Sequence, residues 1–182
     1  MKKLICVVGM TGRGKDTFAK EISERYKIPI VCSYTTRDMR PGEVDGREHH
    51  FISKERMKSL LDEANVIAYA KKPSGVEYCA TLESLPDEAI YIIDPEGIAY
   101  LQRHFAGKLD LFIVEITCPI EVVKRRVIQR GDDFETFLKR NADEEKEWSE
   151  FHDSGVWQIS IDSNQPLNNM LDLFGGAYDC SR

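Results

Sequence analysis

The sequence predicts a single α/β domain in which helices cover both faces of a parallel sheet. Short, continuously apolar segments alternate with segments whose apolar residues recur at helical spacing, a pattern typical of parallel sheets buried on both faces. A glycine-rich turn at residues 9–14 joins the first apolar segment to the first helical one. The length of 182 residues suits one domain, and no internal repeat or Pro/Gly/Ser-rich linker divides the chain.

Composition and charge narrow the class of protein. With 42% apolar and 31% charged residues the chain is neither disordered nor built to span a membrane. Asp and Glu total 31 against 25 Lys and Arg, and the net charge of -6 argues against coating nucleic acid or an anionic membrane. None of the five cysteines forms a C-x-x-C pair, which favours reduced thiols and a cytoplasmic location over zinc or disulfides. The apolar start ends at Gly9 and is expected to be a buried strand rather than a signal peptide.

The first half of the chain predicts both strands and helices. In order, we expect a strand at 3–8, a loop at 9–14, a helix from Lys15 to about Tyr26, a short strand at 29–33 and a long polar segment at 34–50. Ser53 is placed to cap a further helix. Residues 66–81 alternate around Lys72-Pro73-Ser74-Gly75, which indicates a hairpin.

The second half continues the alternation. We expect strands at 89–93 and 111–116, a basic helix from Pro119 through Arg130, a charged helix at about 134–151, a strand at 156–161 and a C-terminal helix. Asp94 is a predicted N-cap, with Pro95 as the first helical residue. The acidic run 143–147 is expected to be a solvated helix face, and His152 an isolated surface or satisfied histidine.

The turn after the first strand has the spacing of a phosphate-binding loop, G-x-x-x-x-G-K. Its glycines let backbone amides face phosphate oxygens, its lysine reaches the β- and γ-phosphates, and the next helix offers its positive end. Asp16 replaces the usual Ser/Thr, and its carboxylate is expected to help hold Mg²⁺ through water. The residues expected to bind ATP are Gly9, Met10, Thr11, Gly12, Arg13, Gly14, Lys15, Asp16 and Thr17.

A second phosphate site is predicted in the polar segment. Arg37 and Arg40 present planar guanidinium groups that can fork around a phosphate. The string from Ser33 to Gly46, continued by Phe51-Ile52-Ser53, resembles the nucleotide-monophosphate-binding segment of guanylate kinases. The resemblance is strong at 3–53 and 121–140 and looser elsewhere. It implies a P-loop three-layer domain with a core at about 1–33 and 82–182, a monophosphate-binding lobe at about 34–81 and a lid at about 131–145.

The resemblance also implies residue roles. By this resemblance Arg37, Arg40 and Tyr78 bind the acceptor phosphate, and His49 replaces a further phosphate-binding tyrosine of the family. Ser33 and Glu43 match residues that line the same pocket, and Asp94 keeps a further acidic position of the substrate site. The arginines that close on the transferring group are Arg126, Arg130 and Arg140. Together with Lys15 these arginines form the expected catalytic set. Phosphoryl transfer needs alignment and charge neutralisation more than covalent chemistry, which suits such a set.

The positions that read the base depart from the family. Ala68, Ala80 and Ile92 stand at these positions, and Glu77 is a candidate substitute. The implied reaction is ATP-dependent phosphorylation of GMP or dGMP, with Mg²⁺ as cofactor and small nucleotides as the only expected partners. Three alternatives stay open. They are a kinase of another monophosphate or ribose bisphosphate, a non-catalytic binding module of the same fold, and a nucleotide-hydrolysing switch.

Overall fold

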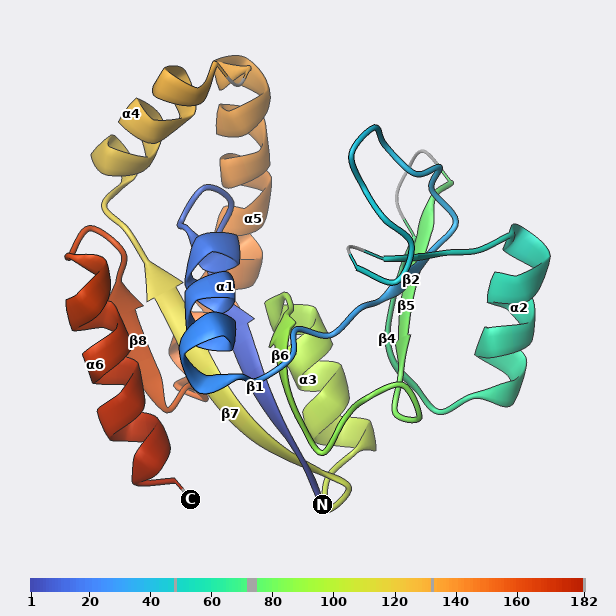
Figure 1. The fold of residues 1–182 in the computed structure, drawn as a ribbon. Coiled ribbons are helices and arrows are strands. Elements are labelled where there is room, and N and C mark those ends of the chain that lie inside the picture. The colour runs from blue at the N-terminus through green and yellow to red at the C-terminus, as the bar shows by residue number, and fades with distance from the viewer. Residues whose placement is uncertain (48, 72–74, 132, 182) are drawn as a thin grey trace.

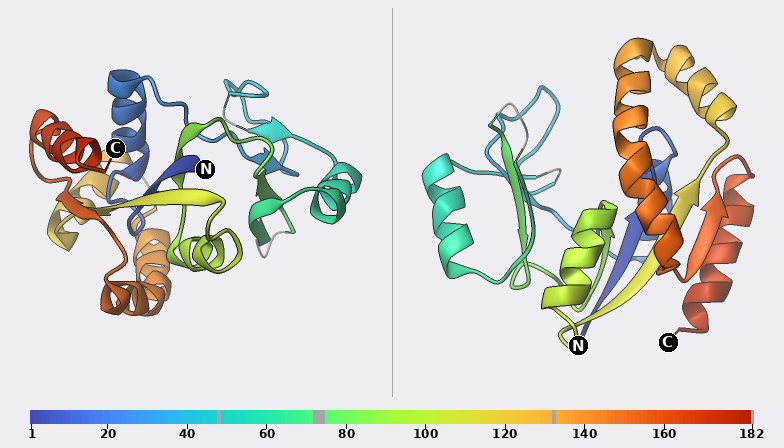
Figure 2. Two further views of the ribbon diagram at one scale, coloured as in Figure 1. Left: turned by 90° about the horizontal axis from the view of Figure 1, so that it is seen from below. Right: turned by 180° about the vertical axis from the view of Figure 1, so that it is seen from behind.

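The computed structural model describes residues 1–47, 49–71, 75–131 and 133–181. Within them two sheets stand side by side, the larger surrounded by helices (Figures 1 and 2). The strands are β1 (Lys2–Val8), β2 (Tyr34–Thr35), β3 (His50–Phe51), β4 (Val66–Lys71), β5 (Glu77–Thr81), β6 (Glu88–Ile92), β7 (Leu109–Thr117) and β8 (Ile159–Asp162). The helices are α1 (Lys15–Tyr26), α2 (Lys54–Glu63), α3 (Pro95–His104), α4 (Ile120–Arg130), α5 (Phe134–Ser154) and α6 (Leu167–Asp179).

The larger sheet is parallel, with the strand order β6-β1-β7-β8. Its central strand β1 is apolar from Leu4 to Val8 and fully buried there, because both faces are covered. Leu4 and Val8 pack toward α3 and α5, whereas Ile5 packs toward α1 and α6. Burial also raises the pKa of the Cys6 thiol, in the same strand, to about 12. The predicted three-layer α/β fold is therefore confirmed.

The smaller sheet has the order β3-β2-β5-β4 and carries α2 on one side (Figure 1). The predicted hairpin is present as the antiparallel pair β4 and β5, although residues 72–74 of its predicted turn lie outside the described residues. Ser53 caps α2 as predicted, since its Oγ accepts a hydrogen bond from the Arg56 amide at 3.1 Å. Ile67 and Ala80 of this hairpin are buried in the same apolar cluster as Leu4, so the two sheets share part of one core.

The connection from the larger sheet to the smaller one differs from prediction. Residues 29–33 are not a strand: Ile30 makes an isolated parallel bridge to Ile90, with Ile90 N donating to Pro29 O and Val31 N donating to Ile90 O, each at 2.8 Å. The chain then leaves the edge of β6, and the short strands β2 and β3 form inside the segment that was expected to be polar loop. Strand β3 pairs with β2, and β2 pairs with β5, where Tyr34 stands opposite Cys79; a local pattern does not show so distant a partner.

The helices of the second half follow the prediction closely. Asp94 caps α3 by accepting from the Gly97 amide at 2.8 Å, and Pro95 is the first residue of the helix. The predicted strand at 156–161 begins later, at Ile159. Helices α4 and α5 meet above the loop that follows β1 (Figure 1), joined by an apolar cluster that includes Val123 and Phe137. Among the helices in the described ranges, none is long and apolar enough to cross a membrane.

Candidate active site

The loop between β1 and α1 has a backbone that requires glycine. Gly12 and Gly14 have φ angles of 79° and 94°, in the left-handed region that side chains rarely adopt. A Cβ atom on Gly12 would stand 2.6 Å from Cγ1 of Val123, so only glycine lets α4 pack this close to the loop. Gly14 is the N-cap of α1 and has no side-chain cap, which leaves the first amides of that helix directed at the loop.

Lys15 lies inside this loop rather than in solvent. Its ammonium group donates to the Met10 carbonyl at 3.1 Å, which closes the loop on itself. Burial lowers the pKa of Lys15, while the charges of Asp16 and Glu144 oppose that shift. Arg13 also binds Met10: its amide donates to the Met10 carbonyl at 3.3 Å, and its guanidinium lies 3.7 Å from the Met10 sulfur. The loop is therefore compact, and Arg13 and Lys15 both bind its Met10 residue.

Asp16 and Thr17 are both exposed on the first turn of α1. In the described ranges no three His, Cys, Asp or Glu side chains gather closely enough to hold a metal ion by themselves. Mg²⁺ in phosphoryl-transfer sites is usually held by one or two carboxylates together with substrate phosphates and water. One exposed carboxylate beside a phosphate loop fits that requirement.

Glu144 of α5 contacts the loop directly, contrary to the prediction of a solvated acidic face. The Thr11 amide donates to Glu144 Oε2 at 2.8 Å, and the Thr11 hydroxyl donates to Oε1. Sequence reasoning missed this residue because it treated the run 143–147 as one unit. The available signal was its spacing: Glu144 follows Arg140 by four residues, and such residues share a helix face.

The three arginines expected to close on the transferring group occupy different places. Arg126 of α4 donates to Ser163 through both terminal nitrogens, at 3.0 Å to Oγ and 2.7 Å to the carbonyl. This brings its guanidinium beside Gly14 at the start of α1. The positive charge of Arg140 contributes to lowering the pKa of Lys15, so Arg140 acts electrostatically on the loop. Arg130 lies exposed at the end of α4.

The smaller sheet brings together the residues expected to bind the acceptor phosphate. Arg37 forms a bidentate pair with Glu43 at 2.8 and 2.9 Å, and the Arg40 amide donates to the same carboxylate at 2.7 Å. The Arg37 guanidinium, followed by the Arg40 amide, lowers the pKa of Glu43 to about 2. Hydrogen bonds to Glu43 and then to Tyr78 raise the pKa of Arg37. Arg37 is thus fixed, whereas the Arg40 side chain is exposed.

His49 and Ser33 complete this cluster. Ser33 Oγ lies 3.0 Å from His49 Nδ1, and the His49 and Tyr78 rings are 5.6 Å apart. Buried Thr35, which sequence reasoning missed, accepts from the Arg37 amide at 3.2 Å and donates to the Glu77 carbonyl at 3.0 Å. Asp94 lies elsewhere, at the carboxyl end of β6, where its carboxylate is engaged as the cap of α3.

The positions expected to read a base carry no acid. Ala68 and Ala80 face each other across the hairpin as a cross-strand pair, and Ile92 is the last residue of β6. Glu77, in the same hairpin, holds a carboxylate that accepts from the Tyr69 hydroxyl at 2.5 Å. This contact, with burial second, raises the pKa of Tyr69.

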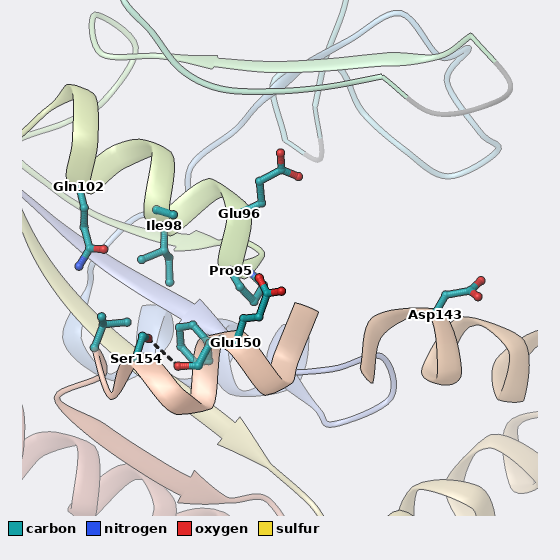
Figure 3. Close-up of a pocket in the computed structure, with 10 residues that line it drawn as sticks. Pro95, Glu96, Ile98, Gln102, Asp143, Glu150 and Ser154 are labelled. Atoms are coloured by element: carbon teal, nitrogen blue, oxygen red, sulfur yellow. Dashed lines mark hydrogen bonds between the residues drawn. The ribbon is translucent and has the colours of Figure 1, made fainter. Parts of the chain in front are cut away.

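A cavity of about 600 Å³ lies between α3 and α5 (Figure 3). Pro95 and Glu96 line it from the first turn of α3, while Asp143 and Glu150 line it from α5. Its lining includes no residue of the phosphate loop. The cavity is therefore distinct from the loop at 9–15 and lies next to the helix that Asp94 caps.

Comparisons with known proteins agree with one another. The family model described as guanylate kinase matches residues 1–172. The chain is 31% identical over 140 residues to a guanylate kinase of Clostridium tetani, covering 74% of this chain and 66% of that protein. It is 32% identical over 163 residues to one of Ruegeria sp., covering 85% and 73%. A solved guanylate kinase from Anaplasma phagocytophilum, 18% identical, shares the fold with a TM-score of 0.68 over 99% of this chain and 86% of that one.

Proposed function

The chain belongs to the guanylate kinase family and is a nucleoside monophosphate kinase, and from that premise we propose that it transfers the γ-phosphoryl group of ATP to GMP or dGMP. The observation that carries the proposal is the loop at 9–15. Its glycine backbone, its uncapped helix start and the inward-turned Lys15 form an anion pocket at the end of a buried parallel strand.

The donor triphosphate binds on this loop. Backbone amides of residues 9–14 and the first turn of α1 hold its phosphate oxygens, and Lys15 exchanges the Met10 carbonyl for a phosphate. Asp16, with Thr17 beside it, is the carboxylate that would hold Mg²⁺ through water. When bound, the metal offsets the negative charge that develops on the phosphates.

The acceptor phosphate binds on the smaller sheet. Because Glu43 stays ionised down to a pH of about 2, Arg37 is held in one orientation over a wide pH range. The exposed Arg40 guanidinium supplies a second charge, while Tyr78, which hydrogen-bonds to Arg37, and the neighbouring His49 add further donors. In this arrangement Arg37 orients the acceptor phosphate, and the exposed Arg40 captures it from solvent.

Transfer itself requires alignment and positive charge. Arg126, whose guanidinium lies beside Gly14, and Arg140, whose charge acts on Lys15, are expected to supply this charge, and Arg130 is expected to join them when the lid closes. No general base is needed, because the acceptor is already an ionised phosphate. These residues act by neutralising charge between donor and acceptor and by excluding water.

The alanine pair in the hairpin favours a second candidate function, phosphorylation of nucleoside monophosphates that carry other bases. Guanine presents N–H donors on its pairing edge, and Ala68, Ala80 and Ile92 offer no acceptor side chains for them. Glu77 is the hairpin carboxylate that would replace them. If Glu77 does not reach the base, the enzyme discriminates weakly among bases, since rejection depends on leaving buried polar groups unpaired.

A coupled assay of ADP release tests the proposal. It is run over the common ribo- and deoxyribonucleoside monophosphates and ribose bisphosphate, with wild type and Lys15→Ala. We expect the wild type to show its highest kcat/KM with GMP or dGMP. We expect Lys15→Ala to show no turnover with any acceptor. If only another acceptor is turned over, that acceptor is the substrate and the assignment to GMP or dGMP is refuted. ATP binding without any turnover assigns the binding module instead and refutes the kinase reaction.

A further inference from the structure

The contact between Glu144 and the phosphate loop places a carboxylate where an anionic ligand is proposed to bind. Both oxygens are used, one by the Thr11 amide at 2.8 Å and the other by the Thr11 hydroxyl. A carboxylate and a phosphate accept hydrogen bonds from the same kinds of donor. A donor phosphate that uses the Thr11 amide must therefore displace Glu144.

The charges around the loop support the same reading. Arg13 and Arg140 surround Lys15 with like charge, while Asp16 and Glu144 supply the opposite charge. Of these residues, Glu144 is the acidic one on α5, and its carboxylate also accepts a hydrogen bond from the loop backbone. It therefore acts toward the cationic loop as an anion would.

The rest of α5 is seated on the loop as well. Phe137, two turns before Glu144, is buried in the cluster with Val123 and Val127. An atom of its ring would lie 3.4 Å from a Cβ built on Gly12. The helix thus rests on the loop at two adjacent residues, by an apolar contact at Gly12 and a polar one at Thr11. Breaking the polar contact removes one of two attachments.

We propose that Glu144 is an internal competitor of the donor phosphates: it occupies the loop at Thr11 when ATP is absent and must be displaced when ATP binds. The proposal rests on the proposed donor site. An internal competitor raises the apparent Kd by the inverse of the fraction of molecules in which the contact is open. The contact re-forms once the nucleotide has left, so the competition slows nucleotide association rather than dissociation.

The experiment measures ATP, ADP and GMP binding by calorimetry, and the association and dissociation rates of ADP by stopped flow. The variants are Glu144→Ala, Glu144→Gln and the control Glu145→Gln, which removes the same charge from an exposed neighbour on the same helix. Glu144→Gln keeps the size of the side chain, so it serves if the alanine variant is poorly folded. Thermal unfolding checks that each variant is folded.

We expect Glu144→Ala to bind ATP and ADP about three- to tenfold more tightly, because both nucleotides associate faster by a similar factor. Glu144→Gln should show a smaller gain, while GMP binding and Glu145→Gln stay at the wild-type values. Unchanged or weaker ATP binding in folded Glu144→Ala would overturn the competitor role and assign Glu144 to holding the helix. Folded wild type that binds no ATP would instead overturn the proposed donor site, and the competitor role with it.

Discussion

Replacing Gly12 by alanine tests the architecture of the phosphate loop. Two costs apply at this position. The backbone has a φ of 79°, which costs a residue with a Cβ about 1–2 kcal/mol. The new Cβ would also stand 2.6 Å from Cγ1 of Val123, a buried, β-branched side chain that has little freedom to rotate away. Such overpacking costs about 1–3 kcal/mol, so we expect a loss of about 2–5 kcal/mol in total.

Gly107 provides the matched control. Its φ is 78°, almost the same as that of Gly12, but nothing lies within 4 Å of the Cβ that alanine would add. Gly107→Ala therefore carries the backbone cost of about 1–2 kcal/mol alone. The difference between the two variants isolates the clash with α4.

Denaturant and thermal unfolding of both variants give the magnitude. A difference of about 1–3 kcal/mol corresponds to about 2–12 °C in Tm for a chain of this size. Adding Val123→Ala should recover part of the loss in Gly12→Ala and show a coupling of at least about 0.5 kcal/mol, whereas it should not couple to Gly107→Ala. Equal losses in the two glycine variants, with no coupling to Val123, would refute the close packing of loop and helix.

Three further predictions concern the proposed site. Arg40→Ala should raise the acceptor KM about tenfold or more with little change in the Kd of ATP, as steady-state kinetics and calorimetry will show. Arg140→Ala should lower kcat more than it weakens ATP binding, and a change in acceptor KM alone would contradict its role. For Glu43, whose pKa falls from 4.5 to about 2 on folding, the stabilisation is present above pH 4.5 and lost as the pH falls toward 2. The difference in unfolding free energy between wild type and Glu43→Gln should thus be constant from pH 8 to about 5 and shrink below it, as urea titrations at each pH will show.

The sequence predicted the elements whose signals are local. Helix α1 was predicted with both of its ends correct, because the phosphate-loop pattern fixes its start and its amphipathic spacing fixes its length. The caps at Ser53 and Asp94 were found because each precedes a helical pattern by one residue. The buried parallel strands were recognisable from their continuous apolar runs.

What the sequence did not show depends on distant partners. Strands β2 and β3 are two residues each and exist because β5 pairs with β2. Glu144 meets Thr11 across 133 residues, so its role requires the position of α5. His152 was correctly expected to be a satisfied or surface histidine, but its partner Glu115, 2.5 Å away and buried in β7, gave no signal in a strand that otherwise reads as apolar.

The way the smaller sheet is attached determines how it can move. The chain enters it from a segment hydrogen-bonded to Ile90 on both sides, and leaves it directly into β6, the strand that contains Ile90. Lys2 steadies the returning segment by donating to the Leu82 carbonyl at 3.1 Å. Both crossings therefore converge on one edge strand, while the buried Ile67 and Ala80 and the hydrogen bond from the Tyr100 hydroxyl to the Val66 carbonyl hold the smaller sheet against α3. Because Pro95 begins α3 three residues after Ile92 ends β6, any displacement of the smaller sheet that shifts β6 or Val66 also acts on Asp94 and its helix.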